Sequence, residues 1–304
     1  MRLDVSALSR PAPGTAILSA MMRAAHLLLD GEPKIFSDHF ASKLAGFESE
    51  AQLKVGLERF LAAVAADAGR ETAEVTFRYL RAGMTLRSRY TEDELERAIE
   101  RGLAQYVILG AGLDSFAYRQ RTAAPGLRVF EVDLPSSQHW KRERLRTLGM
   151  AEPDGLVYVP LDLEHQTLEE GLRAAGYRAQ QPAFFSWLGT TQYLTADAVF
   201  KTLEAIASLA PGGEVVFTYQ APEAAQDADS RRVLHVLKTR AAQGGAAWLS
   251  SFEPAALVAR LATSGFAEAV DFGPEQARAR YFAGRTDDLV VPRLSRIMKA
   301  RVAR

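Results

Sequence analysis

The sequence predicts an α/β protein in which a parallel seven-strand sheet is covered by helices on both faces and carries an N-terminal helical cap. Two observations support this prediction. The first hundred residues show helical periodicity and no strand pattern. From Gln105 onward, short apolar and β-branched runs alternate with segments of helix length. We expect the cap to span residues 1–103 and the sheet-containing unit to span residues 104–304.

The cap is expected to contain four helices. In the first, apolar residues from Leu18 to Leu29 recur at steps of four, three and four, and Gly31 ends the helix. Two more helical patterns cover residues 50–66 and 72–89. A fourth helix is expected to follow them and to end at a second glycine.

The start of that fourth helix is predicted from a capping box. Thr91 lies three residues before Glu94, a spacing at which the two side chains can satisfy each other's backbone N–H groups. Gly102 then ends the helix.

The rest of the chain alternates between strands and helices. The predicted strands are 106–109, 127–132, 156–159, 183–188, 214–219, 267–272 and 296–302. The helices predicted between them are 135–149, 195–209 and 253–263. The polar, alanine-rich stretch 221–245, with a helix at 231–240, is interpreted as an insertion over the sheet edge.

The composition excludes several classes of protein. Hydrophobic residues make up 48% and charged residues 24% of the chain, which is typical of a globular protein. Lys and Arg together number 37, as do Asp and Glu, so no global positive field attracts nucleic acid. There is no cysteine and no apolar run of about 20 residues. We expect a soluble, cytoplasmic protein with no metal site and no nucleic-acid or membrane partner; its oligomeric state is not predicted.

A glycine-containing loop after the first strand is the main candidate site. Gly110 and Gly112 allow a ligand to approach the backbone closely, although tight turns without a ligand also use this pattern. A dinucleotide fingerprint needs a third glycine where this chain has Ser115, and Asp114 beside it would repel a diphosphate. Asp133, at the end of the second strand, lies where an acid commonly binds ribose hydroxyls. These features favour a phosphate-free nucleoside with an amine, such as S-adenosylmethionine.

Four segments together resemble the leucine carboxyl methyltransferase family, most closely its bacterial branch. They are Arg87-Ser88-Arg89-Tyr90, the loop from Val107 to Ser115, the stretch from Phe130 to Pro135, and Leu161-Asp162-Leu163. The resemblance implies a class I methyltransferase with a Rossmann-like sheet and S-adenosyl-L-methionine as cofactor. It further implies O-methylation of a carboxylate or hydroxyl on a small-molecule acceptor, in this branch a secondary metabolite.

The resemblance also implies roles for particular residues in cofactor binding. Gly110 and Gly112 would pack against the methionine part, Asp133 would hold the ribose, and Asp162 with Leu163 would hold the adenine. An arginine before the first strand would hold the cofactor's carboxylate, because a guanidinium can pair with it through two hydrogen bonds. Arg87 and Arg89 are both candidates for this role.

One position departs from the family pattern. After the fourth strand the family commonly has a glutamate, whereas this chain has Leu188. One polar contact to the cofactor is therefore missing or supplied by another residue.

A carboxylate acceptor needs no base, whereas an alcohol or phenol would benefit from one. His26 is one candidate for the pocket, with ordinary packing as its alternative. Tyr193 and Tyr219 lie at strand ends, where side chains line ligand clefts or pack in the core. Arg285 is a candidate partner for an acidic acceptor, and a structural ion pair with a nearby aspartate is its alternative.

Three other functions remain open from the sequence. One is methylation of a protein's C-terminal carboxylate. Another is an oxidoreductase or nucleotide-binding module built on the same sheet, which Asp114 and Ser115 argue against. The third is a non-catalytic binding protein of this fold, to which Leu188 gives some weight.

Overall fold

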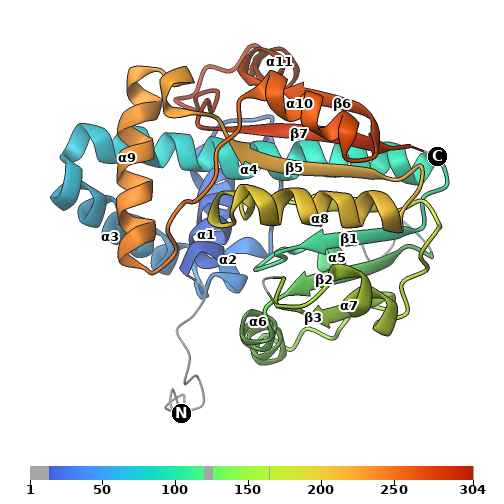
Figure 1. Ribbon diagram of the computed structural model, residues 1–304. Helices are drawn as coiled ribbons and strands as arrows, with labels where there is room; N and C mark the ends of the chain where they lie inside the picture. Colours follow the sequence, from blue (N-terminus) through green and yellow to red (C-terminus); the bar gives the residue numbers. More distant parts are fainter. Residues whose placement is uncertain (1–13, 120–125, 164, 304) are drawn as a thin grey trace.

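The computed structural model describes residues 14–119, 126–163 and 165–303, and its centre is a seven-stranded sheet of order β3-β2-β1-β4-β5-β7-β6 (Figure 1). The strands are β1 (Gln105–Leu109), β2 (Arg128–Asp133), β3 (Leu156–Pro160), β4 (Phe184–Trp187), β5 (Glu214–Gln220), β6 (Phe266–Phe272) and β7 (Ser295–Val302). The first five strands pair in parallel, and β7 lies antiparallel between β5 and β6. The expectation of an all-parallel sheet was therefore wrong at this edge. No long crossover helix separates β6 from β7, so the chain returns in the opposite direction.

The described helices flank this sheet. Those before β1 are α1 (Gly14–Leu29), α2 (Ala41–Leu44), α3 (Glu50–Ala68) and α4 (Arg70–Glu100). Those after β1 are α5 (Phe116–Arg119), α6 (Pro135–Thr147), α7 (Leu168–Ala174), α8 (Ala196–Leu209), α9 (Ala228–Gln243), α10 (Pro254–Thr263) and α11 (Pro274–Ala277). Among these helices, none combines the length and the apolar character that crossing a bilayer requires.

The capping box predicted at Thr91 is wrong, because α4 runs unbroken from Arg70 to Glu100. Thr91 is buried within this helix. Instead of closing a capping box, the Glu94 carboxylate accepts hydrogen bonds from Lys299 at 2.7 Å and from Arg280 at 3.0 Å. Glu94 is thus bound by two cationic side chains that lie 186 and 205 residues further along the chain. A pattern of neighbouring residues cannot predict such contacts.

The two faces of the sheet bury different sets of side chains. Tyr106 and Ile108 of β1 face a core that also contains residues of α1 and α4, whereas Val107 and Leu109 face a core formed with α7, α8 and α10. Figure 1 shows α8 in front of the sheet and α4 behind it. The cap and one face of the sheet therefore share a continuous hydrophobic core. The boundary between residues 103 and 104 remains a prediction.

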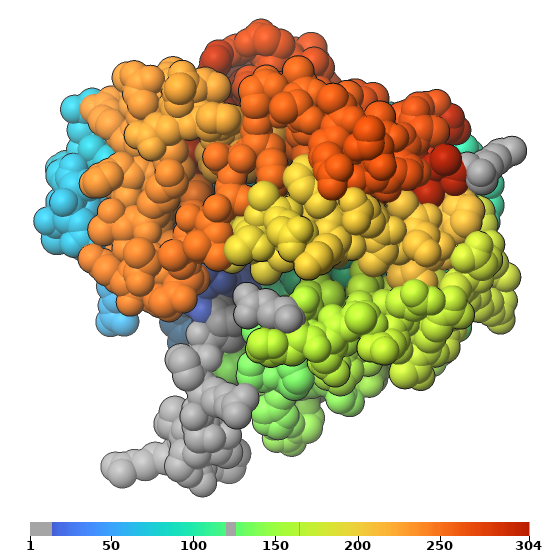
Figure 2. Space-filling model, viewed as in Figure 1, coloured from blue at the N-terminus to red at the C-terminus, as the bar shows by residue number. Residues whose placement is uncertain are grey.

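The segment between β5 and α10 contains a longer helix than the sequence indicated. Helix α9 begins after Asp227, whose side chain accepts the Ser230 N–H at 2.8 Å, and it packs against α3 and α4. Arg240 of α9 pairs with Asp67 of α3 at 2.7 Å, and Arg232 pairs with Glu71 of α4 at 3.2 Å. In Figure 2 the orange surface of α9 adjoins the cyan surface of the cap.

A buried ion pair lies beside the end of β2. Lys141 Nζ of α6 donates to Glu131 Oε2 at 2.6 Å, and both side chains are about 1% exposed. Burial raises the pKa of Glu131 to about 7, although the Lys141 ammonium acts in the opposite direction. This pair fixes α6 against the strand that carries Asp133.

Replacing Lys141 with methionine should therefore destabilise the protein strongly. Lys141→Met leaves Glu131 buried without its cation, and removing one partner of a buried pair typically lowers the free energy of unfolding by about 3–5 kcal/mol. Urea denaturation measures this loss. The double variant Glu131→Gln/Lys141→Met removes both charges and should recover part of the stability. A loss below about 1 kcal/mol in the single variant would contradict a structural role for the pair.

Candidate functional site

The loop after β1 is attached to the end of β2 by backbone and side-chain hydrogen bonds. The N–H groups of Gly110 and Ala111 both donate to the Val132 carbonyl, at 2.9 and 3.2 Å. The Gly112 N–H donates to Asp133 Oδ2 at 2.6 Å, and Oδ1 of the same carboxylate accepts the Leu134 N–H at 2.7 Å. The two sequence motifs thus form one structure at the carboxyl edge of the sheet, where β1 lies between β2 and β4 and strand order reverses.

Both glycines of this loop are required by close packing as well as by backbone conformation. Gly110 has φ +65°, and a Cβ there would lie 2.5 Å from Cγ2 of Thr190. Gly112 has φ +48°, and a Cβ there would approach the Cβ of Ala16 in α1 to 3.1 Å. Side chains are therefore excluded where the cap, the loop and the segment after β4 meet.

A cavity of about 240 Å³ lies over this loop. It is bounded by residues of α1, by Arg87 and Ser88 of α4, by the β1 loop from Gly110 to Asp114, by Asp133 and Leu134, and by Leu188, Gly189 and Thr190 after β4. Leu188, which departs from the family pattern, is therefore at the cavity wall. The buried Thr190 Oγ1 has no hydrogen-bond partner among the described residues.

The structure distinguishes the two candidate arginines. Arg87 lines the cavity, and its guanidinium packs so closely over Gly189 that a Cβ there would lie 2.3 Å from it. Its Nη2 donates to Ser19 Oγ at 2.9 Å, and no described carboxylate forms an ion pair with it. Arg89 instead pairs with Asp93 at 2.7 Å, and its side chain is 49% exposed. Two residues apart on a helix, the arginines point in different directions.

Arg23 of α1 is a cavity residue that the sequence analysis missed. Its guanidinium pairs with Asp38 at 2.9 Å and donates to Ser19 Oγ at 3.0 Å and to the Leu113 carbonyl at 2.7 Å. The available signal was a charged residue in the middle of a helix whose other residues are mostly apolar. Arg23 joins the cap to the β1 loop, and its charge is already balanced by Asp38.

The cavity is positive at one side and negative at another. Burial lowers the pKa of the Arg87 guanidinium to about 10, and the like charge of Arg23 acts in the same direction, yet Arg87 stays protonated at neutral pH. Asp114 and Asp133 line the same cavity. Burial raises the pKa of Asp133, against the effect of its two N–H donors. This arrangement suits a ligand with both a carboxylate and cationic groups.

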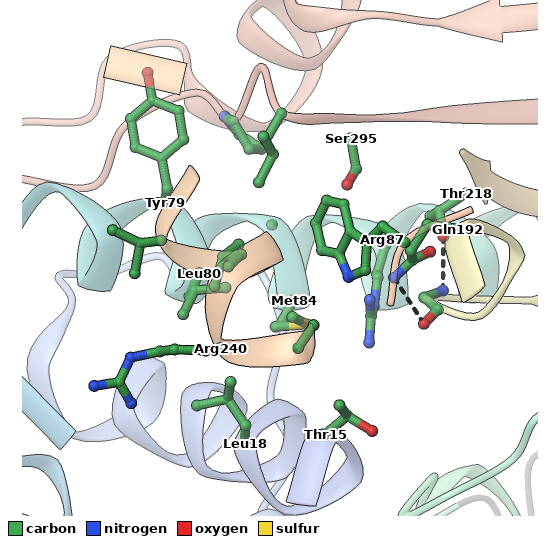
Figure 3. Close-up of a pocket in the computed structure, with 18 of the residues that line it drawn as sticks. Thr15, Leu18, Tyr79, Leu80, Met84, Arg87, Gln192, Thr218, Arg240 and Ser295 are labelled. Atoms are coloured by element: carbon green, nitrogen blue, oxygen red, sulfur yellow. Dashed lines mark hydrogen bonds between the residues drawn. The ribbon is translucent and has the colours of Figure 1, made fainter. Parts of the chain in front are cut away.

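A second cavity of about 520 Å³ (Figure 3) adjoins the first. Thr15, Arg87 and Gly189 line both cavities. Its walls come mainly from apolar side chains of α1, α3, α4 and α9. Near the shared residues, Gln192 Nε2 donates to the Gly189 carbonyl at 3.0 Å, and the Gly189 N–H donates to Thr218 Oγ1 at 2.7 Å. Tyr193, a predicted pocket residue, lines this cavity and packs edge-on against Trp248.

The other three pocket candidates line neither cavity. His26 is fully buried; its Nδ1 contacts Asp30 at 2.7 Å, and its Nε2 accepts the Ile35 N–H at 3.1 Å. The hydroxyl of Tyr219 donates to Asp271 at 2.7 Å. Arg285 forms an ion pair with Asp287, the structural alternative considered for it. All three have structural partners in the described part of the chain.

The role predicted for Asp162 and Leu163 at the adenine end of the cofactor remains a prediction. Asp162 and Leu163 follow β3, next to the end of β2, because the Leu161 N–H donates to the Asp133 carbonyl at 2.9 Å. The Asp162 N–H donates to Gln166 at 3.1 Å. Neither residue is among those bounding the cavity over the β1 loop.

Comparison with known proteins identifies the family. A profile of the family described as leucine carboxyl methyltransferase matches residues 16–207, more than half of the chain. This chain belongs to the leucine carboxyl methyltransferase family. A Bacillus subtilis relative, "Putative S-adenosyl-L-methionine-dependent methyltransferase YktD", is 30% identical over 90% of this chain and 93% of its own. A relative in Mycobacterium avium with the same description is 31% identical over 71% of this chain and 70% of its own.

Solved structures show the same fold at low sequence identity. A Thermobifida fusca structure described as a methyltransferase covers both chains fully at 17% identity, with a TM-score of 0.54. A Streptomyces avermitilis protein of the DUF574 family covers 86% of this chain and 95% of its own at 15% identity, with a TM-score of 0.54. Together with the family, they identify the sheet as that of a class I methyltransferase.

The protein is therefore an S-adenosyl-L-methionine-dependent methyltransferase. The residues over the β1 loop fit this cofactor. Arg87 offers a positive charge with no described carboxylate paired to it, Gly110 and Gly112 line the cavity without side chains, and Asp133 holds a carboxylate at the end of β2. We assign the cofactor carboxylate to Arg87 and the ribose to Asp133 as hypotheses that the following variants test.

Replacing Arg87 should weaken binding of the cofactor through loss of one charged contact. In Arg87→Gln, we expect the affinity for S-adenosylhomocysteine to fall by about 1.5–3 kcal/mol, the usual range for hydrogen bonds to a charged group. Calorimetric titration of the variant and the wild-type protein measures this affinity. The affinity for methylthioadenosine, which lacks the carboxylate, should stay unchanged, and Arg89→Gln should affect neither ligand. Equal losses for both ligands would remove Arg87 from this role.

Replacing Asp133 should weaken both ligands alike, because both contain the ribose. Asp133→Ala leaves ligand hydroxyls and the Gly112 N–H without an acceptor, so we expect a loss of about 1–3 kcal/mol for each ligand. The same titrations provide the measurement, and thermal unfolding of the variant provides the control for folding. Unchanged affinity would refute the ribose assignment.

Proposed function

We propose that this methyltransferase transfers the methyl group to a carboxylate oxygen of a small, largely apolar molecule, in its biological context a secondary metabolite. The observation that supports this is the residue content of the larger cavity. Among the described residues that line it, none is Asp, Glu, His or Lys. The charged side chains there are Arg87 and Arg240. Apart from the side chains of Tyr79 and Tyr193, which are phenols and so belong to a class normally protonated at neutral pH, the described lining offers no side chain that could act as a general base. This favours an acceptor that is already an anion.

A carboxylate meets this requirement, since carboxyl groups ionise with pKa values of about 4 and are deprotonated at neutral pH. When bound, S-adenosyl-L-methionine supplies a methyl group on a positively charged sulfur. The carboxylate oxygen forms a bond to the methyl carbon as the carbon–sulfur bond breaks and its electron pair stays on sulfur. The products are a methyl ester and a neutral thioether, and no proton is transferred. An alcohol acceptor, by contrast, must lose a proton to a base.

The contribution of the chain is positioning and exclusion of water. Thr15, Arg87 and Gly189 line both cavities, so the acceptor and the cofactor meet at these residues. The hydrogen bonds from Gly189 to Thr218 and from Gln192 to Gly189 hold this junction in one conformation. Aligning two reactants in this way removes much of the entropic part of the barrier. The apolar walls keep water away from the reacting oxygen.

The size of the cavity supports a small acceptor over the C-terminus of a protein. A volume of about 520 Å³ lies within the range of ordinary small-molecule sites, roughly 300–1,000 Å³. Helix α9 lies against α3 and α4, and residues of all three line the cavity. A protein acceptor would need an open groove along which the chain could leave.

The proposal is tested with matched acceptors and labelled S-adenosyl-L-methionine. We expect transfer of the label to decanoic acid and little transfer to 1-decanol, because only the acid presents an anionic oxygen without a base. Product mass spectrometry identifies the ester. Efficient methylation of the alcohol, or activity with neither compound or any other apolar carboxylic acid, would overturn the proposal. Labelling of an extract of the source cells then identifies the natural acceptor.

The pH dependence of the same reaction gives a second readout. With the acid as substrate, kcat/KM should rise only through the ionisation of the acceptor, near pH 4 to 5, and then stay level to about pH 9. Burial raises the pKa of Glu131 to about 7, so the variant Glu131→Gln is the control. A further rise near pH 7 that remains in this variant would reveal a base and contradict the mechanism.

A further inference from the structure

The larger cavity carries a charged group at each end and apolar side chains between them. In Figure 3, Arg87 and Arg240 lie on opposite sides of the view, and Leu18, Leu80 and Met84 lie between them. Val236 and Leu237 of α9 extend the apolar wall toward Arg240. An acceptor that fills this space from the cofactor side therefore ends near a second guanidinium.

Arg240 is only partly satisfied within the described part of the chain. Its Nη2 donates to Asp67 Oδ2 at 2.7 Å, but its Nε is buried and has no hydrogen-bond partner. A buried N–H without an acceptor is costly, and a guanidinium has five such donors. Asp67 is 54% exposed, so water screens its interaction with Arg240. The far end of the cavity thus keeps both positive charge and hydrogen-bonding capacity.

A second unpaired donor, the buried indole Nε1 of Trp248, lines the same cavity next to Tyr193. It lies near Gln192 and thus toward the Gly189 end, so Arg240 is the unsatisfied donor group of the far end. An acceptor with oxygen at one end only would leave the Arg240 end of the cavity in contact with hydrocarbon. Burying hydrocarbon against a charged, unsatisfied group is unfavourable.

We propose that the natural acceptor has oxygen at both ends, with its methylated carboxylate where the two cavities meet, beside Gly189, and a second, hydrogen-bond-accepting oxygen group bound by Arg240. This inference rests on the proposed function and makes it more specific. The expected substrate class is an apolar-bodied dicarboxylic or ω-oxygenated carboxylic acid. Arg240 is then a specificity-determining residue that lies away from the reacting atoms.

The test compares acids that differ only at the far end. Decanoic acid, 10-hydroxydecanoic acid and decanedioic acid are titrated calorimetrically into the enzyme saturated with S-adenosylhomocysteine, and the eight- and twelve-carbon analogues vary the reach. At the best length, we expect the hydroxy acid or the diacid to bind at least tenfold more tightly than the monoacid. The comparison of these two distinguishes a neutral from an anionic far group.

Variants separate ligand binding from a merely structural role of the ion pair. Arg240→Gln should abolish the advantage of the oxygenated acids, so that decanoic acid, 10-hydroxydecanoic acid and decanedioic acid bind with similar affinity. Asp67→Asn releases Arg240 from its carboxylate and should increase that advantage severalfold. If Arg240 only fastened α9 to the cap, both variants would break the same bridge and change all affinities in the same direction.

Arg232→Gln is the matched control, because Arg232 also pairs α9 with the cap, through Glu71, but does not line the cavity. It should change none of the three affinities. Equal binding of the mono- and difunctional acids at every length overturns this inference, while methylation of decanoic acid would still uphold the proposed function. If no acid binds or is methylated, both proposals fail together.

Discussion

Two guanidinium groups share one serine hydroxyl at the junction between the cap and the sheet, and the rest of the site depends on how their charges are balanced. Arg23 and Arg87 both donate to Ser19 Oγ, at 3.0 and 2.9 Å. Asp38 neutralises Arg23, whereas no described acid pairs with Arg87. Asp114 acts on Arg87 only through its charge. Arg87 is therefore the guanidinium left free to pair with a ligand anion, which is the role that the Arg87 variant tests.

Arg87 also connects the two cavities. Arg87 lines both, and Gly189 lets its guanidinium pack directly against the backbone after β4. On the cofactor side, Asp114 and Asp133 provide negative charge opposite Arg87. In the larger cavity, most of the lining side chains between Arg87 and Arg240 are apolar. The two cavities thus differ in where their charges lie, and this difference is the basis for assigning the cofactor to one and proposing an anionic, apolar acceptor for the other.

The parts of the site that the sequence predicted are those built from local segments. The β1 loop and the end of β2 could be recognised because Gly110, Gly112 and Asp133 form one motif with a short-range geometry. The sequence could not show which of Arg87 and Arg89 faces the cavity, because this depends on how α4 is rotated about its axis relative to the sheet. The capping box predicted at Thr91 was wrong for a related reason. The position lies within the long helix α4, and the Glu94 carboxylate accepts hydrogen bonds from Lys299 and Arg280. His26 showed a pocket-like pattern, but its partners come from the loop after α1.

The acceptor cavity could not be predicted because its walls come from distant parts of the chain. Leu18, Tyr79, Arg240 and Ser295 all line it, and no periodicity links them. The sequence therefore left carboxylate and hydroxyl acceptors equally open. The proposal of a carboxylate rests on a property of the assembled wall, namely that its described residues include arginines but no Asp, Glu, His or Lys. In such a pocket the ionisation of the substrate itself would select the acceptor, so the proposed specificity follows from the groups that the wall lacks as much as from those it contains.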